Sequence, residues 1–110
     1  MVPGFTLDVH PADDGGTRVV AGGELDLAVA PEFKRRVAAL LADGPVLLDL
    51  RELEFMDSSG VRVLDALTGI AEVEGHAFQV ASEMQAPVRQ VLEMTGMLGV
   101  LSLTDGEQAS

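Results

Sequence analysis

The strongest constraint on the fold is an apolar run, Val46–Leu50, followed after a short polar stretch by an amphipathic segment that lasts to about Glu74. The run has the length of a strand and is dense enough in aliphatic residues to be central in a sheet. Phe55-Met56-Asp57-Ser58-Ser59-Gly60 joins the two segments and places serine hydroxyls where a loop becomes a helix. A strand followed by a helix predicts an α/β fold with a serine at the surface.

Strand and helix periodicities alternate along the rest of the chain. Two-residue alternation or short apolar runs predict further strands over residues 5–10, 17–23, 78–81 and 100–103. Apolar residues at helical spacing predict helices over about 31–43, 59–74 and 85–95. The predicted order is β-β-α-β-α-β-α-β. Because the opening hairpin is antiparallel and β-α-β units favour parallel neighbours, we expect a mixed β-sheet with helices packed on it.

Length and composition favour one globular domain. With 110 residues, the chain is predicted to be a single domain over 1–110, with a core at about 5–104 and a polar tail at 105–110. There is no cysteine, so neither a disulfide nor a thiolate metal site is expected. The apolar runs are shorter than the roughly 18 residues of a spanning helix, and the N-terminus does not resemble a signal peptide. A cytoplasmic protein without a membrane segment is the simplest expectation.

The chain is strongly acidic. Seven Lys and Arg residues against 18 Asp and Glu residues give a formal net charge of −11. Nucleic acid and anionic lipid would repel such a surface, so we predict neither as a partner. A protein that binds this surface tightly should supply positive charge of its own.

The serines of Asp57-Ser58-Ser59-Gly60 allow two interpretations. In the first, Ser58 is a helix N-cap that accepts a backbone hydrogen bond, and Asp57 favours the positive end of the helix dipole. In the second, the serines are open to modification, with Gly60 leaving space for approach. A phosphate there would face free backbone N–H groups.

A serine hydrolase is a third interpretation. Its nucleophile motif would read Gly-x-Ser-x-Gly, and here Met56 stands in place of the first glycine. The two histidines, His10 and His76, have no evident reason to approach Ser58. No pair of carboxylates has the context of a metal site. We therefore expect no enzyme, no metal and no cofactor.

Two further stretches have structural alternatives. Gly22-Gly23-Glu24-Leu25-Asp26 could be a strand end with a glycine bend, in which Glu24 and Asp26 are ordinary solvated charges. The simplest interpretation of the charged positions between Arg62 and Glu72 is the solvated face of a helix.

Taken together, these segments resemble a known family. Four strings in this order are very similar to the STAS-domain anti-anti-sigma factors of bacteria, over about residues 5 to 104: Gly23-Glu24-Leu25-Asp26-Leu27, Pro31-Glu32-Phe33, Leu48-Asp49-Leu50 and Phe55-Met56-Asp57-Ser58-Ser59-Gly60. The resemblance implies a mixed sheet with helices packed on it.

The resemblance also implies a function. Members bind an anti-sigma factor that is a serine kinase of the histidine-kinase-like ATPase type, and so free a sigma factor. That kinase phosphorylates the serine after the motif aspartate, which maps to Ser58 with Ser59 as the alternative, and a metal-dependent phosphatase reverses this. Asp57 assists presentation of the hydroxyl. The implied partner-binding residues are Glu24, Asp26, Asp57, Ser58, Ser59, Gly60 and Arg62.

The chain departs from the family pattern at two positions. Arg62 stands where members often carry glycine, and Ala30 where a capping Ser or Thr often precedes the proline. STAS domains also occur in anion transporters, lipid-transport machines and stress-sensing assemblies. A scaffold or interaction module of a larger signalling or transport assembly, never phosphorylated, is therefore the alternative. A short domain with Asp-Ser-Ser-Gly fits the antagonist best.

Overall fold

The computed structural model describes residues 4–13 and 15–105, so Asp14 of the first turn and residues 106–110 of the expected tail lie outside it. Within the described residues, one sheet has the strand order β1-β2-β3-β4-β5. β1 is antiparallel to β2, and all later neighbours are parallel. The strands are β1 (Phe5–Pro11), β2 (Thr17–Leu25), β3 (Val46–Met56), β4 (Phe78–Met84) and β5 (Leu103–Thr104).

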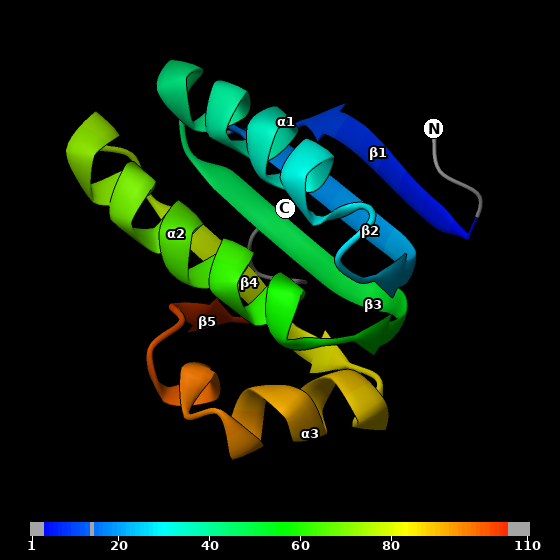
Figure 1. Cartoon of the computed structure of the whole chain (residues 1–110). Helices are drawn as coiled ribbons and strands as arrows, with labels where there is room; N and C mark the ends of the chain where they lie inside the picture. The colour runs from blue at the N-terminus through cyan, green and yellow to red at the C-terminus, as the bar shows by residue number, and fades with distance from the viewer. Residues whose placement is uncertain (1–3, 14, 106–110) are drawn as a thin grey trace.

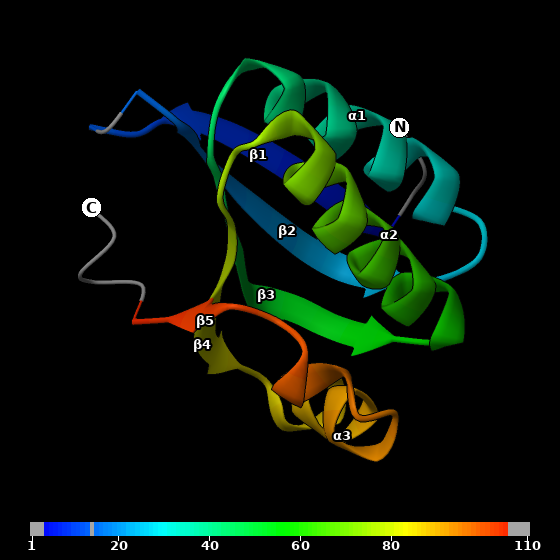
Figure 2. The same cartoon turned by 90° about the vertical axis from the view of Figure 1, so that its left-hand side faces the viewer.

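Three α-helices and one 3-10 turn in the described part of the chain connect the parallel strands: α1 (Ala30–Asp43), α2 (Ser58–Glu74), α3 (Ala86–Met94) and η1 (Met97–Gly99). α1 and α2 lie side by side across one face of the sheet, and α3 packs beyond them against β3 (Figures 1 and 2). The predicted mixed sheet and the predicted order of strands and helices are confirmed. None of the helices described is long and apolar enough to cross a bilayer.

The hydrophobic core lies between the sheet and the helices. Alternate residues of β3, Val46, Leu48 and Leu50, point into it and meet Phe33 and Leu67 of the two covering helices. Phe5 packs edge-on against Phe33, with the ring centroids 5.9 Å apart, which ties the edge strand β1 to α1.

β3 is longer than the predicted strand, which ended at Leu50. Its pairing with β2 shifts by one residue after Val20 and again after Gly23, so β3 contains two irregularities. Leu53 and Met56 stay buried across these shifts, whereas the residues between them are exposed. The shifts break the two-residue alternation, which is why the polar-looking segment was not predicted as a strand.

The predicted last strand at Val100–Leu103 is wrong in its placement. Residues 97–99 form η1, and pairing with β4 starts only at Leu103, opposite Val80. Leu101 is instead a buried core residue on the connection. A short apolar run is compatible with a strand and also with a turn whose side chains pack on the core. Here the run belongs to such a turn, because Leu101 is buried before the pairing with β4 begins.

Gly23, near the end of β2, lies in close contact with the backbone of Gly4 and Phe5. Its φ is +87°, and a Cβ built there would lie 1.8 Å from the Gly4 carbonyl oxygen. The next amide, that of Glu24, donates a hydrogen bond to that oxygen over 2.9 Å. The expected glycine bend is therefore a position that only glycine can occupy, and it directs the chain toward the loop before α1.

A buried carboxylate lies on the sheet face that points away from α1 and α2. Asp49 is 2% exposed and forms ion pairs with Arg18 of β2 and with Arg51. The Arg51 backbone N–H and Nη2 donate to its two oxygens, each over 2.9 Å. Burial raises the pKa of Asp49, but hydrogen bonds from Arg51 and Arg18 outweigh burial and hold this pKa below its usual value.

Candidate functional site

Asp57, not Ser58, is the N-cap of α2. Asp57 has extended backbone, and its Oδ1 accepts a hydrogen bond from the Ser59 backbone N–H over 2.8 Å. Its carbonyl oxygen accepts from Gly60 and Val61. The interpretation of Ser58 as the capping residue is therefore wrong, because the neighbouring carboxylate already fills that role.

Ser58 is the first residue of α2, and its side chain is exposed. Among the described residues, its hydroxyl has no hydrogen-bond partner. Ser59 follows it as a half-buried residue whose N–H is occupied by Asp57. Of the two serines, Ser58 therefore offers the accessible oxygen at the positive end of the α2 dipole.

Gly60 has a packing role that the sequence did not reveal. It is buried, and a Cβ there would lie 2.7 Å from Cγ of Met56 and 3.0 Å from Cγ of Leu25. The first turn of α2 therefore rests directly on the ends of β2 and β3. That Gly60 leaves the hydroxyls open to approach stays a prediction, and the structure adds that its missing side chain lets α2 begin in contact with Met56 and Leu25.

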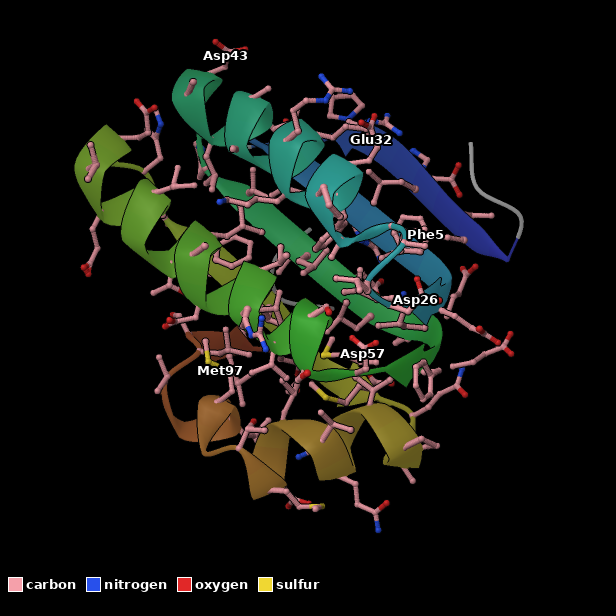
Figure 3. The ribbon with its side chains drawn as sticks, viewed as in Figure 1. Phe5, Asp26, Glu32, Asp43, Asp57 and Met97 are labelled. Atoms are coloured by element: carbon pink, nitrogen blue, oxygen red, sulfur yellow. The ribbon has the colours of Figure 1, made fainter. Side chains whose placement is uncertain are left out.

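The β2–α1 loop approaches the same end of the sheet. The Asp57 N–H donates to the Leu25 carbonyl oxygen over 3.3 Å, which joins this loop to the start of α2. Asp26 is half-buried, and its Oδ1 accepts from the Ala28 N–H over 3.0 Å. Glu24 is exposed at the end of β2. Figure 3 shows Asp26 and Asp57 on neighbouring segments, just before the starts of α1 and α2.

Arg62 lies one helical turn after Ser58 and is exposed. Residues four apart in a helix are neighbours on its surface. No ion pair involves Arg62 in the part of the chain that is described, so its guanidinium is free to meet a new charge. The predicted site residues are thus brought to one end of the sheet, on the β2–α1 loop and the first turns of α2.

Neither histidine lies near Ser58. His10 pairs with Arg18 near the hairpin end of β1, away from the loops at the end of β2. His76 follows the C-terminus of α2, where its Nδ1 donates to the Leu41 carbonyl oxygen over 2.6 Å. The 17 residues of α2 separate His76 from Ser58 by roughly 25 Å. The Ser58 hydroxyl therefore has no histidine base beside it.

An open pocket of about 550 Å³ lies elsewhere, at the end of β4 and the start of α3. Two of its lining residues make hydrogen bonds to backbone: Gln85 donates to the Arg51 carbonyl oxygen over 3.0 Å, and Arg89 donates to the Ser82 carbonyl oxygen over 2.6 Å. The residues that line the pocket include none of the predicted site residues.

The arrangement is that of an α/β module with an exposed serine hydroxyl at a helix start and acidic side chains on the neighbouring segments. The sequence matches the domain family described as "Mlab, STAS domain" over residues 10–103, and the chain belongs to this STAS-domain family.

Named relatives share parts of the chain. The anti-sigma-F factor antagonist RsfB of Mycobacterium tuberculosis is 34% identical over 64 residues, which are 56% of this chain and 52% of RsfB. The chain therefore matches about half the length of that relative.

Solved structures share the fold. A crystal structure of an anti-sigma factor antagonist from Mycobacterium paratuberculosis has a TM-score of 0.83 and 28% identity, over 98% of this chain and 93% of that one. Bacillus SpoIIAA in the phosphorylated form has a TM-score of 0.70 and 18% identity, over 94% of this chain and 96% of that one. Its identity is low, so this likeness concerns the fold alone.

Proposed function

We propose that this protein is an anti-sigma factor antagonist. Its unphosphorylated form binds an anti-sigma factor that is also a serine kinase, and this frees a sigma factor. Phosphorylation of Ser58 releases the partner, and a metal-dependent serine phosphatase restores binding. The protein acts in the cytoplasm, where sigma factors meet RNA polymerase, and is regulatory rather than catalytic.

The observation that carries the proposal is the exposed hydroxyl of Ser58 at the first position of α2. Asp57 occupies the capping position, so Ser58 is not required to stabilise the helix. A kinase can therefore reach the oxygen and modify it without unfolding the helix start. The antagonists named among the relatives and solved structures support the same role.

A phosphate on Ser58 should change the surface more than the fold. It adds about −1.5 to −2 charges at neutral pH. The helix dipole favours that charge, but Asp57 already holds the Ser59 N–H and contributes a negative charge of its own. We therefore expect the phosphate on the exposed Ser58 to add its charge at the surface that contacts a bound partner, and so to weaken binding. At a desolvated contact, a cost of roughly 1.4 kcal/mol weakens binding tenfold.

The test uses intact mass after incubation with a purified anti-sigma factor kinase and ATP. One added phosphate, mapped to Ser58 by peptide sequencing, is the expected result. Ser58→Ala should remove it, and Ser59→Ala, the matched control, should retain it. Phosphorylated protein should then bind the kinase at least tenfold more weakly than unmodified protein.

A scaffold role is the competing function. A module that docks constitutively should gain no phosphate with any anti-sigma factor kinase, and Ser58→Asp should bind its partner as tightly as the wild type. A phosphate on Ser59 alone would keep the antagonist role but move the switch by one residue.

A further inference from the structure

Several large apolar side chains are exposed in the described part of the chain: Val9, Leu27, Phe55, Val73, Met94, Val100 and Leu103. Two of these belong to the segments that form the candidate site. Leu27, in the β2–α1 loop, is 72% exposed, and Phe55, just before Asp57, is 45% exposed. Single exposed apolar residues are ordinary, but two beside one functional group call for a reason.

The fold brings the two segments together at one end of the sheet. Phe55 pairs with Glu24 on the neighbouring strand, and Met56 pairs with Leu25. The Asp57 N–H then joins the Leu25 carbonyl oxygen. Leu27 is two residues beyond that junction and Phe55 is two residues before it. Both residues therefore lie at the end of the sheet where α2 begins with Ser58.

The exposure of Leu27 is imposed by its turn. The side-chain carboxylate of Asp26 accepts a hydrogen bond from the Ala28 N–H. The backbone carbonyl oxygen of Asp26 accepts from the amides of Val29 and Ala30. Leu25 and Val29, on either side, are fully or almost fully buried. The turn is thus anchored at both ends and holds Leu27 outward, so little backbone freedom remains to be lost when a partner binds.

Phe55 is held outward in a similar way. It lies between Leu53 and Met56, whose side chains are at most 1% exposed. The register shift next to Glu54 turns both Glu54 and Phe55 out of the core. The aromatic ring is therefore presented by a strand whose neighbouring side chains are anchored in the core, so that a partner with a matching pocket could desolvate it fully.

Carboxylates surround these two side chains. Glu24 and Glu54 are exposed, and Asp26 and Asp57 are half-buried on the same loops and strand ends. The only described cation within one helical turn of Ser58 on α2 is Arg62. An apolar centre with an acidic border is complementary to an apolar recess with a border of Arg and Lys.

We infer that Leu27 and Phe55 are the apolar anchors of the surface around Ser58, and that the bound protein covers them with an apolar recess bordered by basic residues. The inference rests on the proposed function for the identity of that protein, an anti-sigma factor kinase. Truncating an anchor of this kind weakens binding by roughly 30-fold.

The experiment measures affinity calorimetrically between the unphosphorylated chain and a purified anti-sigma factor kinase. Leu27→Ser and Phe55→Ser should each bind at least tenfold more weakly. Val73→Ser and Met94→Ser are matched controls, because these residues are 88% and 84% exposed outside the surface. Both controls should stay within twofold of wild type. Melting curves confirm that all four variants are folded.

The outcomes separate the two claims. If wild type binds and both anchor variants bind equally well, the inference is wrong and the proposed function stands. If the control variants weaken binding instead, the partner covers a different face and the inference is also wrong. If wild type binds no anti-sigma factor kinase, the proposed function fails and the inference falls with it. Affinity that rises with ionic strength would contradict the basic border.

Discussion

The Oδ1 of Asp57 accepts the Ser59 backbone N–H over 2.8 Å, across the exposed residue between them. This hydrogen bond caps α2 and leaves the Ser58 hydroxyl unused. A helix that depended on Ser58 for its cap would lose a stabilising contact when that oxygen is modified. Here capping and modification are assigned to different side chains, so the hydroxyl can change charge while the helix start stays formed.

The first prediction concerns that cap. Asp57→Ala should lower the free energy of unfolding by about 1 kcal/mol, because the Ser59 N–H loses its acceptor. Asp57→Asn keeps an acceptor oxygen and should stay within a few tenths of a kcal/mol of wild type. Urea denaturation measures both. Equal stability of Asp57→Ala and wild type would show that the cap contributes nothing.

The second prediction concerns Arg62 and a phosphate on Ser58. The two positions are four residues apart on α2, so the guanidinium should pair with the phosphate. A chain made with phosphoserine at position 58 should show a lower second phosphate pKa with Arg62 than with Arg62→Gln. Phosphorus NMR titration measures this difference, which should shrink at high salt. Arg36→Gln, on α1, is the control and should leave the phosphate pKa unchanged.

The third prediction concerns pH and Asp49. Its pKa is lowered in the folded protein, so its contribution to stability is complete above the unfolded value of about 3.9 and is lost as pH falls toward the folded value. Asp49→Asn should cost about 2 to 3 kcal/mol near neutral pH, because Arg18 and Arg51 lose a charged partner.

Denaturation at several pH values tests the Asp49 prediction. Wild-type stability should fall more steeply than that of Asp49→Asn below about pH 4. Asp65→Asn, on the exposed face of α2, is the control and should follow wild type. Parallel curves for wild type and Asp49→Asn would contradict the assignment.

The fourth prediction separates two glycines of α2. Gly60→Ala should destabilise by about 1 to 3 kcal/mol, because its Cβ would lie 2.7 Å from Met56 Cγ. Gly69→Ala meets nothing within 4 Å and should stabilise by about 0.5 to 1 kcal/mol, since alanine favours a helix. Thermal melting of both variants checks the signs. A neutral Gly60→Ala would mean that the start of α2 can lift off the sheet.

The sequence was sufficient for the order of the elements, because local periodicity reports which face of each segment is buried. Helical spacing located α1, α2 and α3 to within two residues at either end. The alternation in Phe5, Leu7 and Val9 located the edge strand β1. The density of aliphatic residues in Val46–Leu50 located the central strand β3. The motif string also pointed to Ser58 at the start of a helix, which is where the structure has it.

The tertiary structure decided what depends on neighbours from distant parts of the chain. The buried carboxylate of Asp49 is paired because strand register sets Arg18, 31 residues earlier, on the neighbouring strand within reach of it. Gly60 is required because Leu25 and Met56 lie beneath it, and Leu27 is exposed because the turn at Asp26 holds it outward. Asp57 and not Ser58 caps α2, because the backbone of Asp57 is extended and that of Ser58 is already helical. Periodicity records which side of an element is apolar, but these contacts depend on strand register and helix position, which form only when the whole sheet assembles.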